Sequence, residues 1–281
     1  MKRLLIIDGH NLLFQMFYGM PSRIINARGE AIHGVLGFVG AVFKIIKMVS
    51  PSDIVVLFDG EHENSRSQIN SEYKKNRIDY TDIPEADNPF SQLKYISEAL
   101  NYMGIKCYEE DVYEVDDVIA SYVYKYKNET NIIISSFDSD YFQLIDENVS
   151  VLRYRGKNTK IYDKISISEK LGVLPEFYAD FKSLTGDHAD NIKGVEKIGI
   201  KTAAELIRRF GNIENIIANS DKIEKERISN SIKSNVQRLR NNYKLIKLTD
   251  VNKIPFALDE LDYSDKGLTT NAVLRGIGLL Y

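Results

Sequence analysis

Three short, unbroken apolar runs separated by longer helical patterns constrain the fold of this chain most strongly. Residues 4–7, 54–58 and 131–134 are rich in Ile, Leu and Val and lack the polar alternation of a half-exposed strand. Such runs are typical of parallel strands covered on both faces. Helical periodicity fills the intervals, over residues 35–48, 90–103 and 116–127. The sequence therefore predicts an α/β domain whose mainly parallel central sheet is flanked by helices.

The remaining chain predicts a second, helical region. Further strands are expected at residues 149–154 and 106–108, whereas the pattern from residue 168 onward is helical. We therefore expect an α/β domain at residues 1–175 and a helical domain at residues 176–281. Residues 60–89 are polar and charged, and so long a segment inside a compact domain indicates a lid or a binding loop.

Cysteine content and hydropathy limit where such a chain works. Cys107 is the single cysteine of the 281 residues, which excludes a disulfide framework and a thiolate metal cluster and fits a reducing compartment. The apolar run after Lys2 and Arg3 is too short for a secretory signal, and no stretch reaches the ~20 apolar residues of a membrane span. We expect a cytoplasmic protein with no membrane partner.

The net charge of -3 conceals an asymmetry along the chain. Residues 181–250 hold 14 Lys and Arg against 9 Asp and Glu, which is +5, and the rest holds 23 against 31, which is -8. An acidic part joined to a basic part predicts one site for cations and one surface for polyanions.

Acidic residues follow each of the three apolar runs. Asp8 and Asp59 end two of them, and the third leads through two serines and Phe137 into Asp138 and Asp140. The carboxyl ends of parallel strands share one edge of a sheet, so these acids are predicted to converge. Two further groups contain carboxylates three residues apart: Glu114 and Asp117, with Asp116 between them, and Asp187 and Asp190.

Taken singly, each of these acids could be a turn residue or a helix cap. That reading does not explain nine carboxylates drawn to one edge, where close pairs repel by several kcal/mol at an effective dielectric of about 20. Ligation by oxygen alone favours Mg²⁺ or Mn²⁺ over Zn²⁺. Two such ions about 4 Å apart would clamp the attacking and leaving oxygens of a phosphodiester. Two ions would change the net charge from -3 to +1.

Two segments offer cations to a polyanion. Residues 66–77 contain Arg66, Tyr73, Lys74, Lys75 and Arg77; a helix there would place Lys74 and Arg77 on one face and Tyr73 where a base could stack. A solvated basic helix is the alternative. Residues 192–203 combine glycines with lysines and a helix start near Lys201, the helix-hairpin-helix pattern that grips DNA phosphates without reading bases.

These motifs resemble the bacterial and phage 5' nucleases, the family of flap endonucleases and of the 5'-3' exonuclease domain of DNA polymerase I. The matching segments are Ile7-Asp8-Gly9-His10-Asn11-Leu12, Phe58-Asp59-Gly60, Arg66, Tyr73-Lys74 with Arg77, Glu114-Val115-Asp116-Asp117, Asp138 to Leu144 and Leu184 to Ala203. They run in the family's order from residue 4 to about residue 215.

The resemblance implies a resolvase-like (PIN-like) 5' nuclease fold, a helical arch at about residues 60–93 and a helix-hairpin-helix at about residues 181–210. It implies that Lys74 and Arg77 stabilise charge on the scissile phosphate. It implies two metal ions held by Asp8, Asp59, Glu114, Asp116, Asp117, Asp138, Asp140, Asp187 and Asp190. The implied DNA contacts are Arg66, Tyr73, Lys75, Lys193, Gly194, Val195, Lys197, Ile198, Gly199, Lys201 and Thr202, with a K⁺ ion at the hairpin carbonyls.

The expected activity is hydrolysis of DNA at 5' flaps and junctions by a monomer that serves DNA replication and repair, including removal of RNA primers. Four positions depart from the family pattern: Gln15, Ser139, His188 and Lys193. A ribonuclease with a related acidic cluster and a junction-binding protein without catalysis are the alternatives. Met1 and the apolar run of residues 277–281 resemble natural ends, but the sequence leaves open whether the chain is stand-alone or a fragment.

Overall fold

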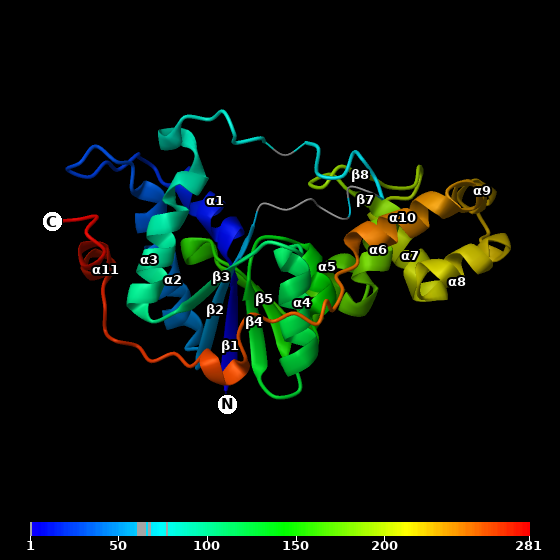
Figure 1. The fold of residues 1–281 in the computed structure, drawn as a ribbon. Helices are drawn as coiled ribbons and strands as arrows, with labels where there is room; N and C mark the ends of the chain where they lie inside the picture. Colours follow the sequence, from blue (N-terminus) through cyan, green and yellow to red (C-terminus); the bar gives the residue numbers. More distant parts are fainter. Residues whose placement is uncertain (1, 61–65, 67–68, 77) are drawn as a thin grey trace.

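A computed structural model describes residues 2–60, 66, 69–76 and 78–281 (Figure 1). Its main sheet has the strand order β3-β2-β1-β4-β5-β6, in which every neighbouring pair is parallel except β5 and β6. The strands are β1 (Arg3–Asp8), β2 (Asp53–Asp59), β3 (Lys106–Glu110), β4 (Asn131–Ser135), β5 (Val149–Arg153) and β6 (Lys160–Tyr162). The predicted parallel sheet is confirmed. The antiparallel β6 was not predicted, because its three residues are largely exposed and carry no buried run.

Helices cover both faces of this sheet, as the unalternated strands require. Leu5 and Ile7 of β1 belong to the core beneath one helical layer, and Leu4 and Ile6 belong to the core beneath the other. The first layer contains α1 (Gly9–Gly19), α2 (His33–Val49), α3 (Leu93–Met103) and α11 (Thr270–Gly276). The second contains α4 (Val115–Tyr126) and α5 (Lys164–Leu171).

A helical unit extends from one side of the α/β domain (Figure 1). It consists of α6 (Tyr178–Thr185), α7 (Ile200–Phe210), α8 (Ile213–Ala218), α9 (Glu226–Ser234), α10 (Val236–Ile246) and the small sheet of β7 (Gly186–Asp187) and β8 (Ile192–Lys193). These helices enclose a separate apolar core that includes Leu184, Leu206, Ile216 and Ile232.

The last part of the chain returns to the α/β domain, which differs from the expected single helical domain at residues 176–281. Ile54 N donates to Leu261 O, and Tyr263 N donates to Ser52 O. Val273 and Leu274 of α11 then join the core beneath α2 and α3. The region from residue 176 onward is therefore divided between two cores.

The polar segment after β2 contains no α-helix in its described residues before α3. Residues 71–76 form turns, and 3-10 turns at Glu85–Asp87 and Pro89–Gln92 precede α3. Lys74 has a left-handed φ of 55°, which an α-helix does not accommodate, and its N–H donates to Asp190 O. The described part of the segment runs from beside β7 and β8 back toward α1 and α3 above the sheet (Figure 1), so these residues cross like an arch and do so without the expected helix.

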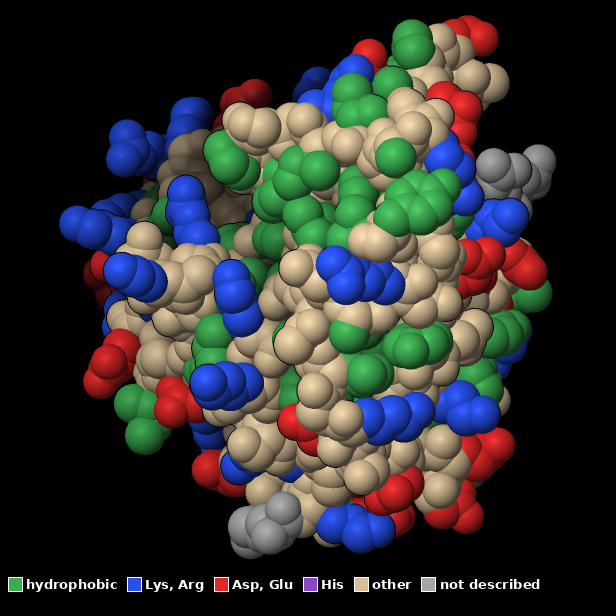
Figure 2. Space-filling model, turned by 90° about the vertical axis from the view of Figure 1, so that its left-hand side faces the viewer, with side chains coloured by type: hydrophobic (Ala, Val, Ile, Leu, Met, Phe, Trp, Pro, Cys, Tyr) green, Lys and Arg blue, Asp and Glu red, His purple; other side chains and the backbone are tan. Residues whose placement is uncertain are grey.

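Figure 2 shows the side of the molecule that carries α2, α3 and α11, where hydrophobic side chains gather among scattered Lys and Arg side chains. Within the described ranges, no helix combines the length and the hydropathy needed to cross a bilayer.

Candidate active site at the carboxyl edge of the sheet

Asp8 and Asp59 end adjacent strands, so the sheet itself brings the first two carboxylates together. In the parallel register Asp8 lies opposite Leu57, two residues before Asp59. Asp8 also caps α1, because its Oδ1 accepts from Asn11 N at 3.1 Å, and its Oδ2 accepts from Ser136 Oγ at 2.8 Å. The Asp8 side chain therefore both caps α1 and contributes a carboxylate to the candidate site.

The first turn of α4 brings a second group of acids to the same edge. Asp59 Oδ1 accepts from Val115 N at 2.8 Å, which fixes the start of α4 against the end of β2. Asp116 and Asp117 lie in the first helical turn, where the positive end of the helix dipole favours carboxylates. Tyr141, which is fully buried, donates from its hydroxyl to Asp116 Oδ1 and lies 3.5 Å from Asp8 Oδ2.

The loop after β4 supplies Asp138 and Asp140. Ser136 connects this loop to the strand ends, since its Oγ donates to Asp8 and accepts from Asp138 N at 2.9 Å. Asp140 N then donates to Asp138 Oδ1 at 2.8 Å, which holds the two carboxylates in a tight turn. Asp140 itself is buried.

Asp187 and Asp190 reach the site from the helical unit. They flank the turn between β7 and β8, and Ala189 N donates to Asp187 Oδ1 at 2.9 Å. Lys182 on α6 forms an ion pair with Asp187 at 2.5 Å. The two parts of the fold thus contribute carboxylates to one shared locus.

The acids act on one another electrostatically. Burial, reinforced by Asp116, raises the pKa of Asp59 and of Asp138 to about 6. Burial also raises the pKa of Asp8, with Asp116 next in importance, and that of Asp140, with Asp138 and Asp187 next. These four carboxylates therefore resist ionisation in the absence of added cations, as expected where an external cation would offset their charge.

Cations of the chain itself already pair with part of this cluster. Arg66 bonds to Glu114 and, at 2.9 Å, to Asp117, while Lys74 Nζ lies 3.2 Å from Glu114 Oε2. Asp117 Oδ1 also accepts from Thr249 N at 2.8 Å. Arg66 is buried with these acids, so in this structure it balances charge within the site.

The donor set fits a hard divalent ion. In the part of the chain that the structure describes, no three His, Cys, Asp or Glu side chains are placed to hold a metal ion together as they stand. Among the same residues, however, the buried atoms Glu114 Oε1 and Asp140 Oδ1 have no hydrogen-bond partner. Unpartnered carboxylate oxygens in a buried acidic cluster are the acceptors that Mg²⁺ or Mn²⁺ would satisfy.

The predicted arch residues are placed unequally. Lys74 faces the carboxylates, and Lys75 is exposed and pairs with Glu72. Tyr73 is only 6% exposed and packs against Ala179, Ile192 and Leu245, so its ring is not available to a base in this arrangement. Arg77 lies outside the described residues.

The helix-hairpin-helix forms as the glycines require. Val195 N donates to Leu184 O at 2.8 Å, and Gly199 precedes α7 in extended conformation. Lys193, Lys197 and Lys201 are exposed, Thr202 is partly buried, and Val195 and Ile198 are buried in the helical core. A Cβ on Gly194 would lie 2.4 Å from the carbonyl of Thr185, so only glycine fits there.

The four departures from the family pattern occupy different settings. Gln15 donates from its side chain to Tyr154 O after β5, and Lys193 O accepts from Asn242 at 2.9 Å. His188 is exposed, and its carbonyl accepts from Asn76 at 3.3 Å. Ser139 lies directly before the 3-10 turn of Asp140–Leu144.

Sequence reasoning missed three residues that organise the acids: Lys182, Tyr141 and Ser136. Lys182 lies five residues before Asp187, near the end of α6. This spacing indicates an ion pair only once the end of α6 is known. Tyr141 and Ser136 flank the Asp138 and Asp140 pair, and nothing in their residue type distinguishes them from core residues.

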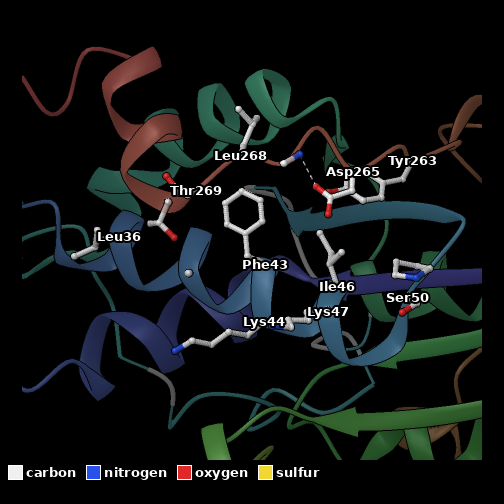
Figure 3. Close-up of a pocket in the computed structure, with 14 residues that line it drawn as sticks. Leu36, Phe43, Lys44, Ile46, Lys47, Ser50, Tyr263, Asp265, Leu268 and Thr269 are labelled. Carbon is white, nitrogen blue, oxygen red and sulfur yellow. Dashed lines mark hydrogen bonds between the residues drawn. The ribbon is translucent and has the colours of Figure 1, made fainter.

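A groove of about 1000 Å³ lies elsewhere, between α2 and the segment before α11 (Figure 3). Phe43 and Leu268 face each other across it, and Lys44 and Lys47 come from the last turns of α2. That end of α2 leads into the amino end of β2, so Lys44 and Lys47 belong to the opposite end of the sheet from the carboxylates.

A resolvase-like sheet with an acidic carboxyl edge, joined to a helix-hairpin-helix unit, defines the 5' nuclease class. The N-terminal resolvase-like domain of 5'-3' exonucleases matches residues 3–172, and their C-terminal SAM fold matches residues 173–267. The chain belongs to the 5'-3' exonuclease family. The resemblance seen in the sequence is thereby confirmed.

Individual relatives agree with this assignment. A 5'-3' exonuclease of Aquifex aeolicus is 34% identical over 88% of this chain and 82% of its own length. That of Buchnera aphidicola is 36% identical over 87% and 85%. A solved variant of bacteriophage T5 flap endonuclease, in a pseudo-enzyme-product complex with DNA and metal ions, aligns with a TM-score of 0.72 at 25% identity, over 98% of this chain and 99% of its own.

Proposed function

We propose that this chain is a structure-specific 5' nuclease that hydrolyses DNA phosphodiesters where a 5' single strand meets a duplex. It would act both as a flap endonuclease and as a 5'-3' exonuclease and leave 5'-phosphate and 3'-hydroxyl ends. The observation that carries this proposal is the convergence of carboxylates from both parts of the fold beside Lys74 and next to the helix-hairpin-helix.

Two Mg²⁺ ions, replaceable by Mn²⁺, are expected at the acidic cluster. Asp8, Asp59, Asp116, Asp138 and Asp140 would supply one group of ligands. In the other group, Glu114 and Asp117 are now paired with Arg66, Glu114 also with Lys74, and Asp187 with Lys182, and Asp190 lies in the turn that follows Asp187. When bound, such ions lower the pKa of a water and offset the charge of the departing 3' oxygen.

The cations of the chain would orient and stabilise the substrate. Lys74 Nζ, 3.2 Å from Glu114 Oε2, can exchange that carboxylate for a non-bridging oxygen of the scissile phosphate as charge develops there. Arg77 is the expected second cation of this step. Arg66 remains with Glu114 and Asp117, where its role is to hold the start of α4 in place.

The helix-hairpin-helix would hold the duplex through its phosphates. Lys193, Lys197 and Lys201 project from the surface, and the N-terminus of α7 directs free N–H groups outward after Gly199. The backbone of Gly194, Val195, Ile198 and Thr202 completes this surface, and a K⁺ ion bound by its carbonyls is part of the proposal. Lys75 adds an exposed cation from the arch.

In its cellular setting we place the enzyme in the cytoplasm as a monomer that acts in DNA replication and repair, including the removal of RNA primers. The α/β part would carry the chemistry and the helical part would bind DNA.

The direct test is incubation with a 5'-labelled flap duplex and Mg²⁺. Cleavage at the junction, its loss in EDTA and its loss in the variant Asp138→Asn are expected, with binding in EDTA retained by the variant. Binding without cleavage by the unaltered protein would assign a junction-binding role instead, and faster cleavage of an RNA strand would assign a ribonuclease. Full activity of Asp138→Asn would overturn the metal assignment.

A further inference from the structure

The proposed metal site takes its carboxylates from two parts of the fold, so the relative position of these parts decides whether the carboxylates can share an ion. Asp138 and Asp140 follow β4 of the α/β domain, whereas Asp187 and Asp190 flank the turn between β7 and β8. The pKa of Asp140 is raised by burial and further by Asp138 and Asp187, which shows that the two pairs interact. A shift of one part against the other would separate them.

Apolar packing joins the two parts but restricts their relative position only loosely. Phe142, two residues after Asp140, packs against Tyr178 at the start of α6, with ring centres 5.7 Å apart. Apolar attraction is non-directional, whereas a hydrogen bond restricts both distance and angle. Directional contacts between the parts are therefore the ones that can set the geometry of the carboxylates.

Gln143 makes such contacts from the α/β side. It is buried in the 3-10 turn of Asp140–Leu144, and its Nε2 donates to Asp140 O at 2.9 Å and to Ile246 O at 3.0 Å. Its Oε1 accepts from Leu248 N at 2.9 Å. A single amide thus bonds to the backbone of the turn that carries Asp140 and to the backbone at the end of α10.

Asn242 continues these contacts toward the second pair of acids. It is buried on α10, one helical turn before Ile246, and its Nδ2 donates to Ser183 O at 3.0 Å and to Lys193 O at 2.9 Å. Ser183 lies on α6, and Lys193 lies in β8, the strand that pairs with Asp187 in β7. α10 runs beside α6, and the chain then passes α4 (Figure 1). Hydrogen bonds therefore lead from one pair of acids to the other through α10.

We infer that Gln143 and Asn242 are positioning residues that fix α10 between the two pairs of carboxylates and so set the geometry of the metal site. We define the α10 brace as these two residues and the helix between their contacts. Within the described residues, both side chains bond only to backbone groups, so they act on the acids through the segments that carry them. This inference rests on the proposed function, because it concerns ions at the proposed site.

The test measures the binding of Mn²⁺ by calorimetry to the full chain without DNA. Gln143→Met and Asn242→Leu keep the approximate size of each side chain and remove its hydrogen bonds, and a double variant combines them. Gln92→Met is the control, with the same substitution in the layer of α2. Gln92 is also buried, and its Oε1 accepts from Val35 N at 2.8 Å.

Urea unfolding checks that each variant folds. A variant without a cooperative transition is replaced by a milder one, Gln143→Asn or Asn242→Ser. The shorter amide of Gln143→Asn cannot span from Asp140 O to the end of α10, and the hydroxyl of Asn242→Ser has one donor for two carbonyls.

We expect each single variant of the α10 brace to raise the Kd for Mn²⁺ about tenfold, as is typical when groups that orient metal ligands are lost. The double variant should lie within about twofold of the single ones, because both residues act through one helix. Gln92→Met should bind Mn²⁺ as the unaltered protein does.

Three results overturn the inference. An unchanged Kd in the Asn242 variant would leave Gln143 as a local support of the turn at Asp140. Losses that multiply in the double variant would show two independent roles, and an equal loss in Gln92→Met would show a general effect of destabilisation. If the unaltered protein binds no Mn²⁺, the proposed function fails instead.

Discussion

Tyr141 is the residue on which the order of the carboxylates depends most directly. Its hydroxyl bonds to Asp116 and lies 3.5 Å from Asp8, and burial raises its pKa well above the usual value, so it can only donate. Tyr141→Phe removes that donor and keeps the ring. We expect the Kd for Mn²⁺, measured by calorimetry on the full chain, to rise about tenfold, as is typical when outer partners of metal ligands are lost.

Tyr122→Phe is the matched control. Tyr122 is also buried and its hydroxyl bonds to Phe256 O at 2.9 Å, but it lies on the far part of α4 from the acids. Its loss should lower the free energy of unfolding by about 1 kcal/mol and leave the Kd for Mn²⁺ unchanged. Equal effects of both variants on Mn²⁺ binding would reduce Tyr141 to a packing residue.

The carboxylates also give the metal-free protein a defined pH dependence. The pKa of Asp59 and of Asp138 is raised to about 6, above the ordinary value near 4, so the folded state favours their protonated forms. These two groups therefore stabilise the folded state at low pH, and this stabilisation is lost as the pH rises from about 4 to about 6. In EDTA, the urea midpoint should fall across this range by the equivalent of on the order of 1 kcal/mol for each carboxylate.

Asp59→Asn and Asp138→Asn should each flatten this profile, because an amide does not titrate. Added Mg²⁺ should also restore stability at neutral pH in the unaltered protein. A midpoint that rises with pH in EDTA would contradict the assigned direction of these pKa shifts.

Residue identity and strand order were enough to predict where the acids converge. Asp8, Asp59 and Asp138 follow strands whose buried runs are plain in the sequence, and the sheet places them at one edge. The partners of those acids were not predictable. Tyr141 and Lys182 act through contacts that exist only once separate elements pack together.

At the scale of elements, the helix-hairpin-helix depends on one glycine for packing and not on another. A Cβ at Gly194 would lie 2.4 Å from Thr185 C and O, whereas a Cβ at Gly199 meets nothing within 4 Å. Gly194→Ala should therefore destabilise the protein by about 1–3 kcal/mol through overpacking and weaken duplex binding. Gly199→Ala should change stability by less than about 1 kcal/mol, and urea unfolding distinguishes the two.

The buried strands were predictable because they are short, unbroken apolar runs, and the helices between them because they carry a helical period. The arch was not, because its polar residues have no period and its conformation is set by contacts with the helical unit. Asn76 Nδ2 donates to Ala189 O and Asn191 Nδ2 donates to Glu72 O, so the turn carrying Asp187 and Asp190 determines the path of the arch. The sequence alone predicted a helix over residues 66–77, whereas residues 71–76 form turns that make these contacts.

At the scale of the molecule, the chain crosses between its two parts more than once. The sequence suggested one boundary near residue 175, but residues 249–281 pack on the α/β domain through Leu261 and α11. This return was not predictable, because most of its apolar residues lie in irregular segments where they follow neither a helical nor a strand period. The chain therefore connects the α/β domain and the helical unit twice, once before and once after the helical unit. These two connections hold the carboxylates of both parts in one site.

The charge distribution leads to a prediction for the whole molecule. The net charge of -3 includes nine acids at the proposed site, so in EDTA these acids repel the phosphates that the basic surfaces attract. Neutralising one carboxylate near a phosphate is worth on the order of 1 kcal/mol, or roughly fivefold in affinity. The double variant Asp59→Asn with Asp138→Asn should therefore bind a flap duplex more tightly than the unaltered protein in EDTA.

Ca²⁺ should tighten binding by the unaltered protein and affect the double variant less, and anisotropy titrations of both proteins with and without Ca²⁺ measure this. Equal affinities of the two proteins in EDTA would mean that the carboxylates do not face the bound DNA.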